Sequence, residues 1–162
     1  MSINDILSWM ESSALGQMMR DSSWLFPGAE ILHFFGLCLL IGSLMVVDLR
    51  LLGVIKEMSY QAIYRFLPIS LIGFGLNLFT GTLFCFTDPF RYYPNIAFRL
   101  KMLLVLLAGL NAIWFKLQIY PLTMNNPERA DASKLAKLVA VLSLLFWFGV
   151  IIMGRMIPYL EE

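Results

Sequence analysis

Four long runs of apolar residues, separated by short polar breaks, dominate the pattern of this chain. The runs cover about residues 24–54, 62–87, 96–120 and 135–159. Each exceeds the ~20 residues that a helix needs to cross about 30 Å of hydrocarbon. The breaks contain Asp88-Pro89 and Asn126-Pro127, which are typical of turns. Because the connections are short, the pattern predicts an all-α fold, an antiparallel bundle of four transmembrane helices.

The segment before the first run has apolar and polar side chains on opposite sides of a predicted helix over residues 3–19. Its apolar positions are Ile3, Ile6, Leu7, Met10, Ala14, Leu15 and Met18. This spacing predicts an amphipathic helix on the membrane surface, and a helix packed on the protein's own flank is an equal alternative. The predicted domains are therefore a surface helix over 1–22 and a transmembrane domain over 23–162. No basic region precedes a cleavable apolar stretch, so the first spanning helix is expected to be an uncleaved insertion signal.

The composition agrees with an integral membrane protein, because 59% of the residues are hydrophobic and the mean hydropathy is +0.75. The net charge of +1, without clustered basic and aromatic residues, argues against a nucleic-acid partner.

Four crossings of the membrane place both termini on one side. Seven of the twelve basic residues lie nearer the other side, which predicts periplasmic termini in a bacterial inner membrane. The bilayer is the expected environment, with a homo-oligomer or a membrane partner subunit as further options.

Charged residues and the single histidine gather at one end of the predicted bundle. His33 follows Glu30 by three positions in the first run, Arg99 and Lys101 open the third, and Arg155 closes the fourth. In an antiparallel bundle all five lie near the same membrane face. We therefore expect an outward-facing layer in which Glu30 pairs with basic residues and His33 lies beneath them. Mutual neutralisation, or basic side chains reaching the headgroups, is the purely structural alternative.

A second polar layer is expected near the opposite face. Asp48 is predicted to form an ion pair with Arg65 or Lys116. Asn111 is expected to supply a buried interhelical hydrogen bond.

Small residues recur every four positions in the second run, at Gly73, Asn77 and Gly81. Such a strip predicts close approach of a neighbouring helix.

One histidine limits the metal chemistry that the chain can support. A haem held by two histidines of one subunit is excluded, so haem b would need His33 with a methionine, a lysine, an open position or a subunit interface. His33 with Met102, Met153 or Met156 would also suit copper(I), which prefers soft ligands.

Three functional hypotheses follow from these residues. The leading one is a redox or metal-linked binding protein in which His33 ligates haem b or copper, while basic residues hold propionates or another anionic group. The alternatives are proton or small-ion transport and a non-catalytic accessory membrane subunit. The sequence lacks a phosphate-binding loop and zinc-ligand pairs, which argues against nucleotide-dependent and hydrolytic chemistry.

Several stretches of the chain resemble a bacterial family of uncharacterised four-helix membrane proteins. They are Trp24–His33, Val47–Gly53, Asn95–Lys101, Ala108–Asn111 and Gly154-Arg155. The resemblance extends over most of the chain from Trp24 to Tyr159 and implies no established activity. The histidine of the first helix and the lysine near the start of the third are more distantly similar to copper-resistance membrane domains. They are also distantly similar to the haem-containing membrane protoporphyrinogen oxidase family.

Overall fold

A computed structural model, which describes residues 2–160, confirms the all-helical four-helix fold. Four helical stretches are long and apolar enough to span a membrane, at Leu25–Leu52, Tyr60–Thr87, Ile96–Asn125 and Lys134–Tyr159. The outer ends of the two predicted domains, Met1 and Glu161-Glu162, lie outside the described residues. The elements are α1 (Ile3–Ser12), α2 (Ala14–Asp21), α3 (Leu25–Leu52), α4 (Tyr60–Ile63), η1 (Tyr64–Phe66), α5 (Leu67–Thr87), α6 (Pro89–Tyr92), α7 (Ile96–Trp114), η2 (Phe115–Ile119), α8 (Tyr120–Asn125), α9 (Pro127–Ala132), α10 (Lys134–Met156) and η3 (Ile157–Tyr159).

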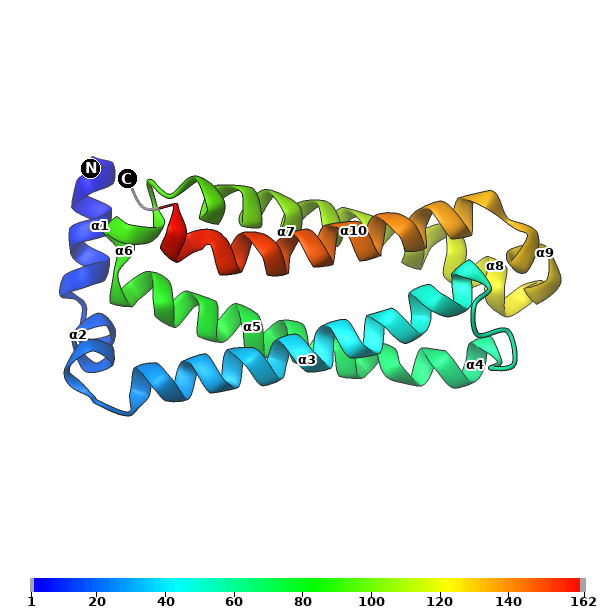
Figure 1. Cartoon of the computed structure of the whole chain (residues 1–162), viewed down its shortest axis with the longest axis horizontal. Coiled ribbons are helices and arrows are strands. Elements are labelled where there is room, and N and C mark those ends of the chain that lie inside the picture. The colour runs from blue at the N-terminus through cyan, green and yellow to red at the C-terminus, as the bar shows by residue number, and fades with distance from the viewer. Residues whose placement is uncertain (1, 161–162) are drawn as a thin grey trace.

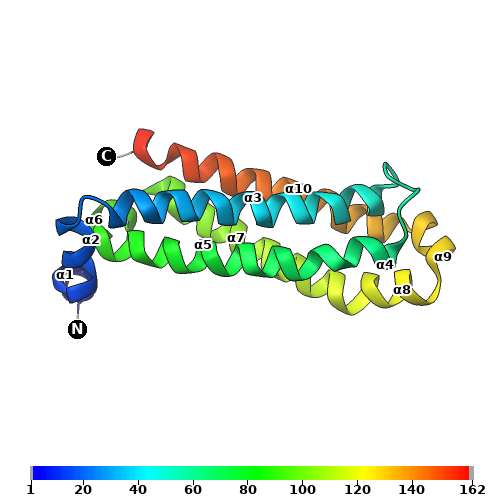
Figure 2. The same cartoon turned by 90° about the horizontal axis from the view of Figure 1, so that it is seen from below.

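The four long helices run side by side along the molecule (Figures 1 and 2). The most extensive helix contacts join α3 with α5, α7 with α10, and α3 with α10. Short helices α1 and α2 lie across one end, while α4, α8 and α9 cover the other (Figure 1). The start of α1 and the end of α10 lie at the same end, as expected for an even number of crossings (Figure 1).

The predicted strip of small residues is where α3 and α5 meet. A Cβ atom added at Gly73 would lie 2.6 Å from both the Gly36 carbonyl oxygen and the Leu40 backbone nitrogen. At Gly36 an added Cβ would lie 2.6 Å from Nδ2 of Asn77. The two backbones therefore approach one another through glycine on each helix, which confirms the expected close approach.

The third membrane helix continues beyond the limit predicted at Tyr120. Its last turns form a π-helix, η2, followed by α8 with Pro121 near the start of that helix. Proline has no N–H and displaces the carbonyl four residues before it, so an α-helix cannot pass through it unchanged. The wider π turn precedes this break, and the helix then continues to Asn125.

The N-terminal segment forms two helices where the sequence predicts one. The chain breaks at Ser13, whose side-chain oxygen accepts a hydrogen bond from the Gly16 backbone N–H at 3.1 Å and so caps α2. Leu7 is buried, and the Trp9 ring lies 6.1 Å from that of Phe86 on α5. The segment therefore packs against the end of the bundle, while Ile3, Ile6 and Met18 stay exposed.

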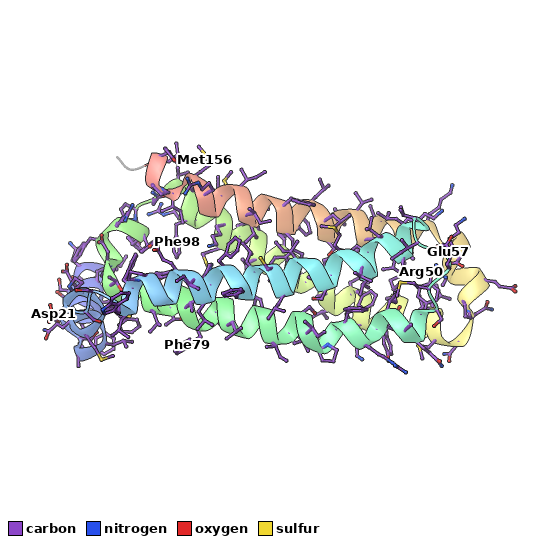
Figure 3. The ribbon with its side chains drawn as sticks, turned by 60° about the horizontal axis from the view of Figure 1, so that its bottom comes forward. Asp21, Arg50, Glu57, Phe79, Phe98 and Met156 are labelled. Atoms are coloured by element: carbon purple, nitrogen blue, oxygen red, sulfur yellow. The ribbon has the colours of Figure 1, made fainter. Side chains whose placement is uncertain are left out.

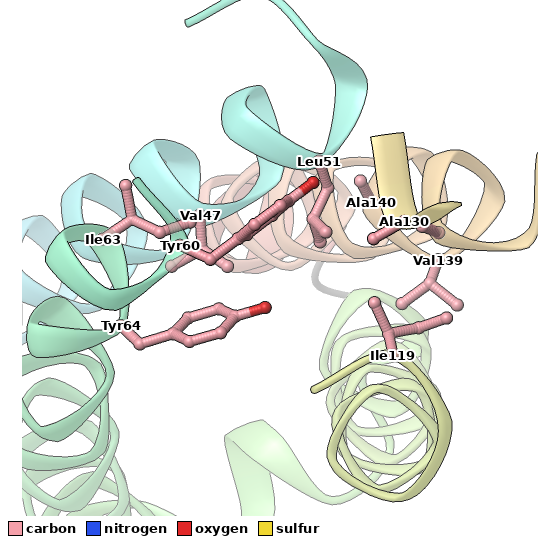
Figure 4. Packing of buried hydrophobic residues seen from close by; sticks show 10 residues of the cluster. Val47, Leu51, Tyr60, Ile63, Tyr64, Ile119, Ala130, Val139 and Ala140 are labelled. Atoms are coloured by element: carbon pink, nitrogen blue, oxygen red, sulfur yellow. The ribbon is translucent and has the colours of Figure 1, made fainter. Parts of the chain in front are cut away.

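Apolar side chains fill one end of the interior and cover the outside of the bundle. A buried cluster lies at the end opposite the termini and contains Val47, Leu51, Tyr60, Ile63, Tyr64, Ile119, Ala130, Ala136, Val139 and Ala140 (Figure 4). On the outside, Phe79 projects away from α5 and Leu71 is 71% exposed (Figure 3). Such an apolar outer surface suits lipid and would be unstable in water.

Candidate functional site

The His33 side chain projects from α3 toward α5, where one of its ring nitrogens has a hydrogen-bond partner. Its Nδ1 lies 2.7 Å from Oγ1 of Thr80, and its ring packs against Phe84 at 5.4 Å between centroids. The Thr80 hydroxyl donates its single proton to the Leu76 carbonyl at 2.7 Å. With that proton on the Leu76 carbonyl, Thr80 accepts a hydrogen bond from the His33 tautomer that carries its proton on Nδ1. In the neutral ring this leaves Nε2 with a free lone pair.

Lys101 enters the same interior from α7. Its side chain lies over Gly154 of α10, where an added Cβ would come within 3.2 Å of Nζ and 3.6 Å of Cε. Gly154 thus leaves the space that the lysine stem occupies. Lys101 is close enough to interact electrostatically with His33 and with Cys85 of α5. Among the described residues, Lys101 belongs to no ion pair.

Cys85, like Thr80, is a member of this group that the sequence pattern does not single out. It lies next to Phe84 in the chain and is half-buried, and its electrostatic neighbour is Lys101. Its position in an apolar run gives no signal that it faces a lysine on another helix. We refer to His33, Thr80, Cys85 and Lys101 as the His33–Lys101 site.

The predicted ion-pair layer around Glu30 is wrong within the part of the chain that the structure describes. Glu30 is exposed, although its neighbour Ala29 is buried, because adjacent helical positions point about 100° apart. Arg99 donates to the Tyr93 carbonyl at 3.0 Å, and the Arg155 guanidinium lies 5.7 Å from the Tyr159 ring. These two basic side chains therefore lie over groups of a loop and of the C-terminal turn. This agrees with the alternative in which basic side chains reach the lipid headgroups.

The three candidate methionine ligands lie in different environments. Met102 on α7 is 46% exposed, while Met153 and Met156 on α10 are partly buried. Within residues 2–160, no group of three or more His, Cys, Asp and Glu side chains is arranged to hold a metal ion. A metal at His33 would therefore need ligands of another kind or from another molecule.

The ion pair predicted for Asp48 is also wrong, because a different pair forms at that end of the bundle. Arg50 binds Asp131 of α9, with NH1–Oδ1 at 2.6 Å, and this is the one ion pair found among the described residues. Lys116 instead lies 4.1 Å from the Tyr120 ring centroid. Asp48 remains buried beside Ser143 of α10.

The Arg50–Asp131 pair joins the end of α3 to the last connection. Arg50 lies at this end of the bundle (Figure 3) and is buried. It also donates through Nε to the Met58 carbonyl at 2.7 Å, and its guanidinium lies 4.1 Å from the Tyr60 ring centroid. The Tyr60 hydroxyl donates to Oδ1 of Asp131 at 2.6 Å. The hydrogen bond from Arg50, with a smaller contribution from Tyr60, lowers the pKa of Asp131.

Replacing Asp131 by asparagine is expected to lower the free energy of unfolding by about 1–3 kcal/mol, because it leaves a buried guanidinium without its carboxylate. The partial exposure of Asp131 keeps this effect below that of a fully buried pair. Folding lowers the pKa of Asp131. The ionised carboxylate therefore stabilises the fold at pH values above its pKa in the unfolded state, and this stabilisation is lost as the pH falls through its pKa in the folded state. Unfolding in detergent at neutral pH and at pH about 2 measures both effects. An equal loss for D131N at the two pH values would contradict this account.

Two surface hollows lie away from the His33–Lys101 site. One is lined by Asp88, Phe90, Arg91, Pro94, Asn95, Ile96 and Leu160. The other is lined by Arg50, Ser59, Tyr60, Gln61, Thr123, Met124 and Pro127. Neither lining includes His33 or Lys101, so the site does not open into either hollow.

Comparison with known proteins confirms the expected uncharacterised family. No curated protein and no solved structure matches the chain. The more distant similarity to copper-resistance domains and to the membrane protoporphyrinogen oxidase family gains no support from these comparisons. The model of a family of unknown function, DUF6644, matches residues 6–160, and the chain belongs to this family.

Proposed function

We propose that this multi-pass membrane protein transfers protons across the bilayer through the His33–Lys101 site. The observation that carries the proposal is the 2.7 Å contact between Nδ1 of His33 and Oγ1 of Thr80, whose hydroxyl also reaches the Leu76 carbonyl. This pair of contacts favours a proton on Nδ1 and leaves Nε2 as a proton acceptor. Histidine changes its charge near physiological pH more readily than any other side chain. Ionisable groups inside a membrane bundle commonly belong to proton relays.

The second group of the relay is Lys101. An ammonium donates protons and a neutral imidazole accepts them, so a proton can leave Nζ of Lys101 and bind Nε2 of His33 directly or through water. Positive charges on both groups repel one another across apolar surroundings. When one of the two groups binds a proton, release of a proton from the other is therefore favoured.

The packing around the two groups favours a ligand as small as a proton. The stem of Lys101 fills the space left by Gly154, and the Phe84 ring covers one side of His33. The Thr80 hydroxyl fixes the ring orientation, so Nε2 keeps its direction between successive proton transfers.

Proton flux into liposomes tests this proposal. Purified protein is reconstituted with a pH-sensitive dye inside the vesicles, and a potassium gradient with valinomycin drives protons inward. We expect flux above that of empty vesicles and a loss of about tenfold or more in His33→Ala. Arg99→Gln, an exposed change at the same end, serves as the matched control and should keep the parental flux. Absence of flux in the parent, or equal flux in His33→Ala, would refute the proposal.

Ligation of haem b or copper by His33 is a second candidate, supported by the same free Nε2. Metal-bound histidines usually donate their other N–H to an oxygen, as His33 does to Thr80. His33 would ligate the haem iron and Lys101 would bind a propionate, and the bound haem would supply one-electron chemistry. A Soret band after haem-replete expression, or stoichiometric copper, that His33→Ala lacks would favour this candidate. The parental protein without either would rule it out.

A further inference from the structure

A second group of polar side chains lies buried in the other half of the bundle, away from the His33–Lys101 site. Asp48 of α3 is 4% exposed and Asn111 of α7 is 6% exposed. Oδ2 of Asp48 and Oδ1 of Asn111 are both buried without a hydrogen-bond donor. Buried oxygen acceptors without a donor are rare and costly in folded proteins.

Both side chains reach the same turn of α10. Nδ2 of Asn111 donates to the Val139 carbonyl at 3.0 Å, which fixes the amide orientation and leaves Oδ1 as the free acceptor. Asp48 interacts with the Ser143 side chain. In an α-helix the carbonyl of residue 139 faces the N–H of residue 143. The Asp48 and Asn111 side chains therefore approach the same turn of α10 from two other helices.

The charged and titratable groups of the surrounding elements do not neutralise Asp48. Arg50, on the same helix, is bound to Asp131 and to the Met58 carbonyl. Lys116 of η2 lies over the Tyr120 ring. The hydroxyls of Tyr60 and Tyr64 bond to Asp131 and to Thr123, respectively. The carboxyl group of Asp48 is thus left without a positive partner among the described residues.

We infer that Asp48, Asn111 and Ser143 form an intramembrane binding site for one small monovalent cation, either a proton or a sodium ion. The site offers only oxygen atoms, the donors that hard cations prefer. One positive charge would neutralise the carboxylate and supply the attraction that both acceptor oxygens lack. A proton would bind to Asp48 and be shared as a hydrogen bond, whereas sodium would be ligated by the three side-chain oxygens.

Two measurements on the purified protein in detergent distinguish these two cations. The first is the midpoint of thermal unfolding in sodium chloride and in choline chloride at equal ionic strength. Bound sodium is expected to raise the midpoint by about 3–8 °C at saturating concentration. The second is the infrared band of a protonated carboxyl group at neutral pH in choline chloride, which a bound proton would produce.

Asp48→Asn should abolish whichever signal the parent shows, and Asp21→Asn, an exposed change at the end of α2, should keep it. If Asp48→Asn does not fold, Ser143→Ala is expected to shift the carboxyl band or to weaken sodium binding about tenfold. A parent with neither signal, or a signal that persists in folded Asp48→Asn, would overturn the inference. Neither measurement depends on His33 or on flux, so this result stands apart from the relay.

Discussion

Replacing Gly73 by alanine is expected to separate α3 from α5 and to lower the free energy of unfolding by about 3 kcal/mol or more. The added methyl group would lie 2.6 Å from the Gly36 carbonyl oxygen and 2.6 Å from the Leu40 backbone nitrogen. These are backbone atoms of a continuous helix, so they cannot rotate aside as a side chain does. The helices must shift apart, which would also disturb the contact between His33 and Thr80.

Gly75 provides the matched control on the same helix. A Cβ added there meets no atom within 4 Å, and alanine favours the helix over glycine by about 1 kcal/mol. Gly75→Ala is therefore expected to be neutral or slightly stabilising. Thermal or denaturant unfolding of both variants in the same detergent measures the difference. Equal stability of Gly73→Ala and Gly75→Ala would show that the α3–α5 packing differs from the one described.

Replacing Lys101 by methionine is expected to stabilise the protein while removing its proton flux. Lys101 lies inside the bundle without an acidic partner, so the substitution breaks no ion pair among the described residues. Methionine is unbranched and flexible and can fill the same groove over Gly154. Removing an unpaired buried amine should raise the free energy of unfolding by about 1–2 kcal/mol. The relay would lose its donor, and flux should fall about tenfold or more.

This pair of opposite effects distinguishes a functional lysine from a structural one. Unfolding midpoints and liposome flux are measured on the same preparations of Lys101→Met and the parent. Lys134→Met, at the exposed start of α10, is the control and should leave flux unchanged. Destabilisation of Lys101→Met together with unchanged flux would mean that Lys101 contributes to packing alone.

Hydropathy and small-residue spacing were enough to predict the spanning helices and one of their contacts. Long apolar runs must be helical in lipid, because every backbone polar group needs an internal partner. The Gly73 strip identified a contact surface, because only glycine permits two helix backbones to approach this closely. The third helix extends beyond the end predicted at Tyr120, with a π turn directly before Tyr120 and Pro121.

The partners of the charged residues could not be predicted in the same way. A helix that is apolar all around gives no periodic signal of which face lies inside. Glu30 and His33 were therefore expected in one polar layer, but Glu30 is exposed and His33 is partly buried. Arg50 binds Asp131, which lies 81 positions later in a connection. Such a contact depends on how the connection folds over the bundle end, and hydropathy does not encode that.

The central claim, that Thr80 holds His33 with Nε2 free to accept a proton, can be tested directly by nitrogen-15 nuclear magnetic resonance. The chain has one histidine, so labelling with nitrogen-15 histidine reports on this side chain alone. At neutral pH we predict a proton on Nδ1 and none on Nε2 in the parent, and loss of that preference in Thr80→Val, which keeps the shape without the hydroxyl. A ring protonated on Nε2 alone in the parent, or an identical spectrum in Thr80→Val, would contradict the account.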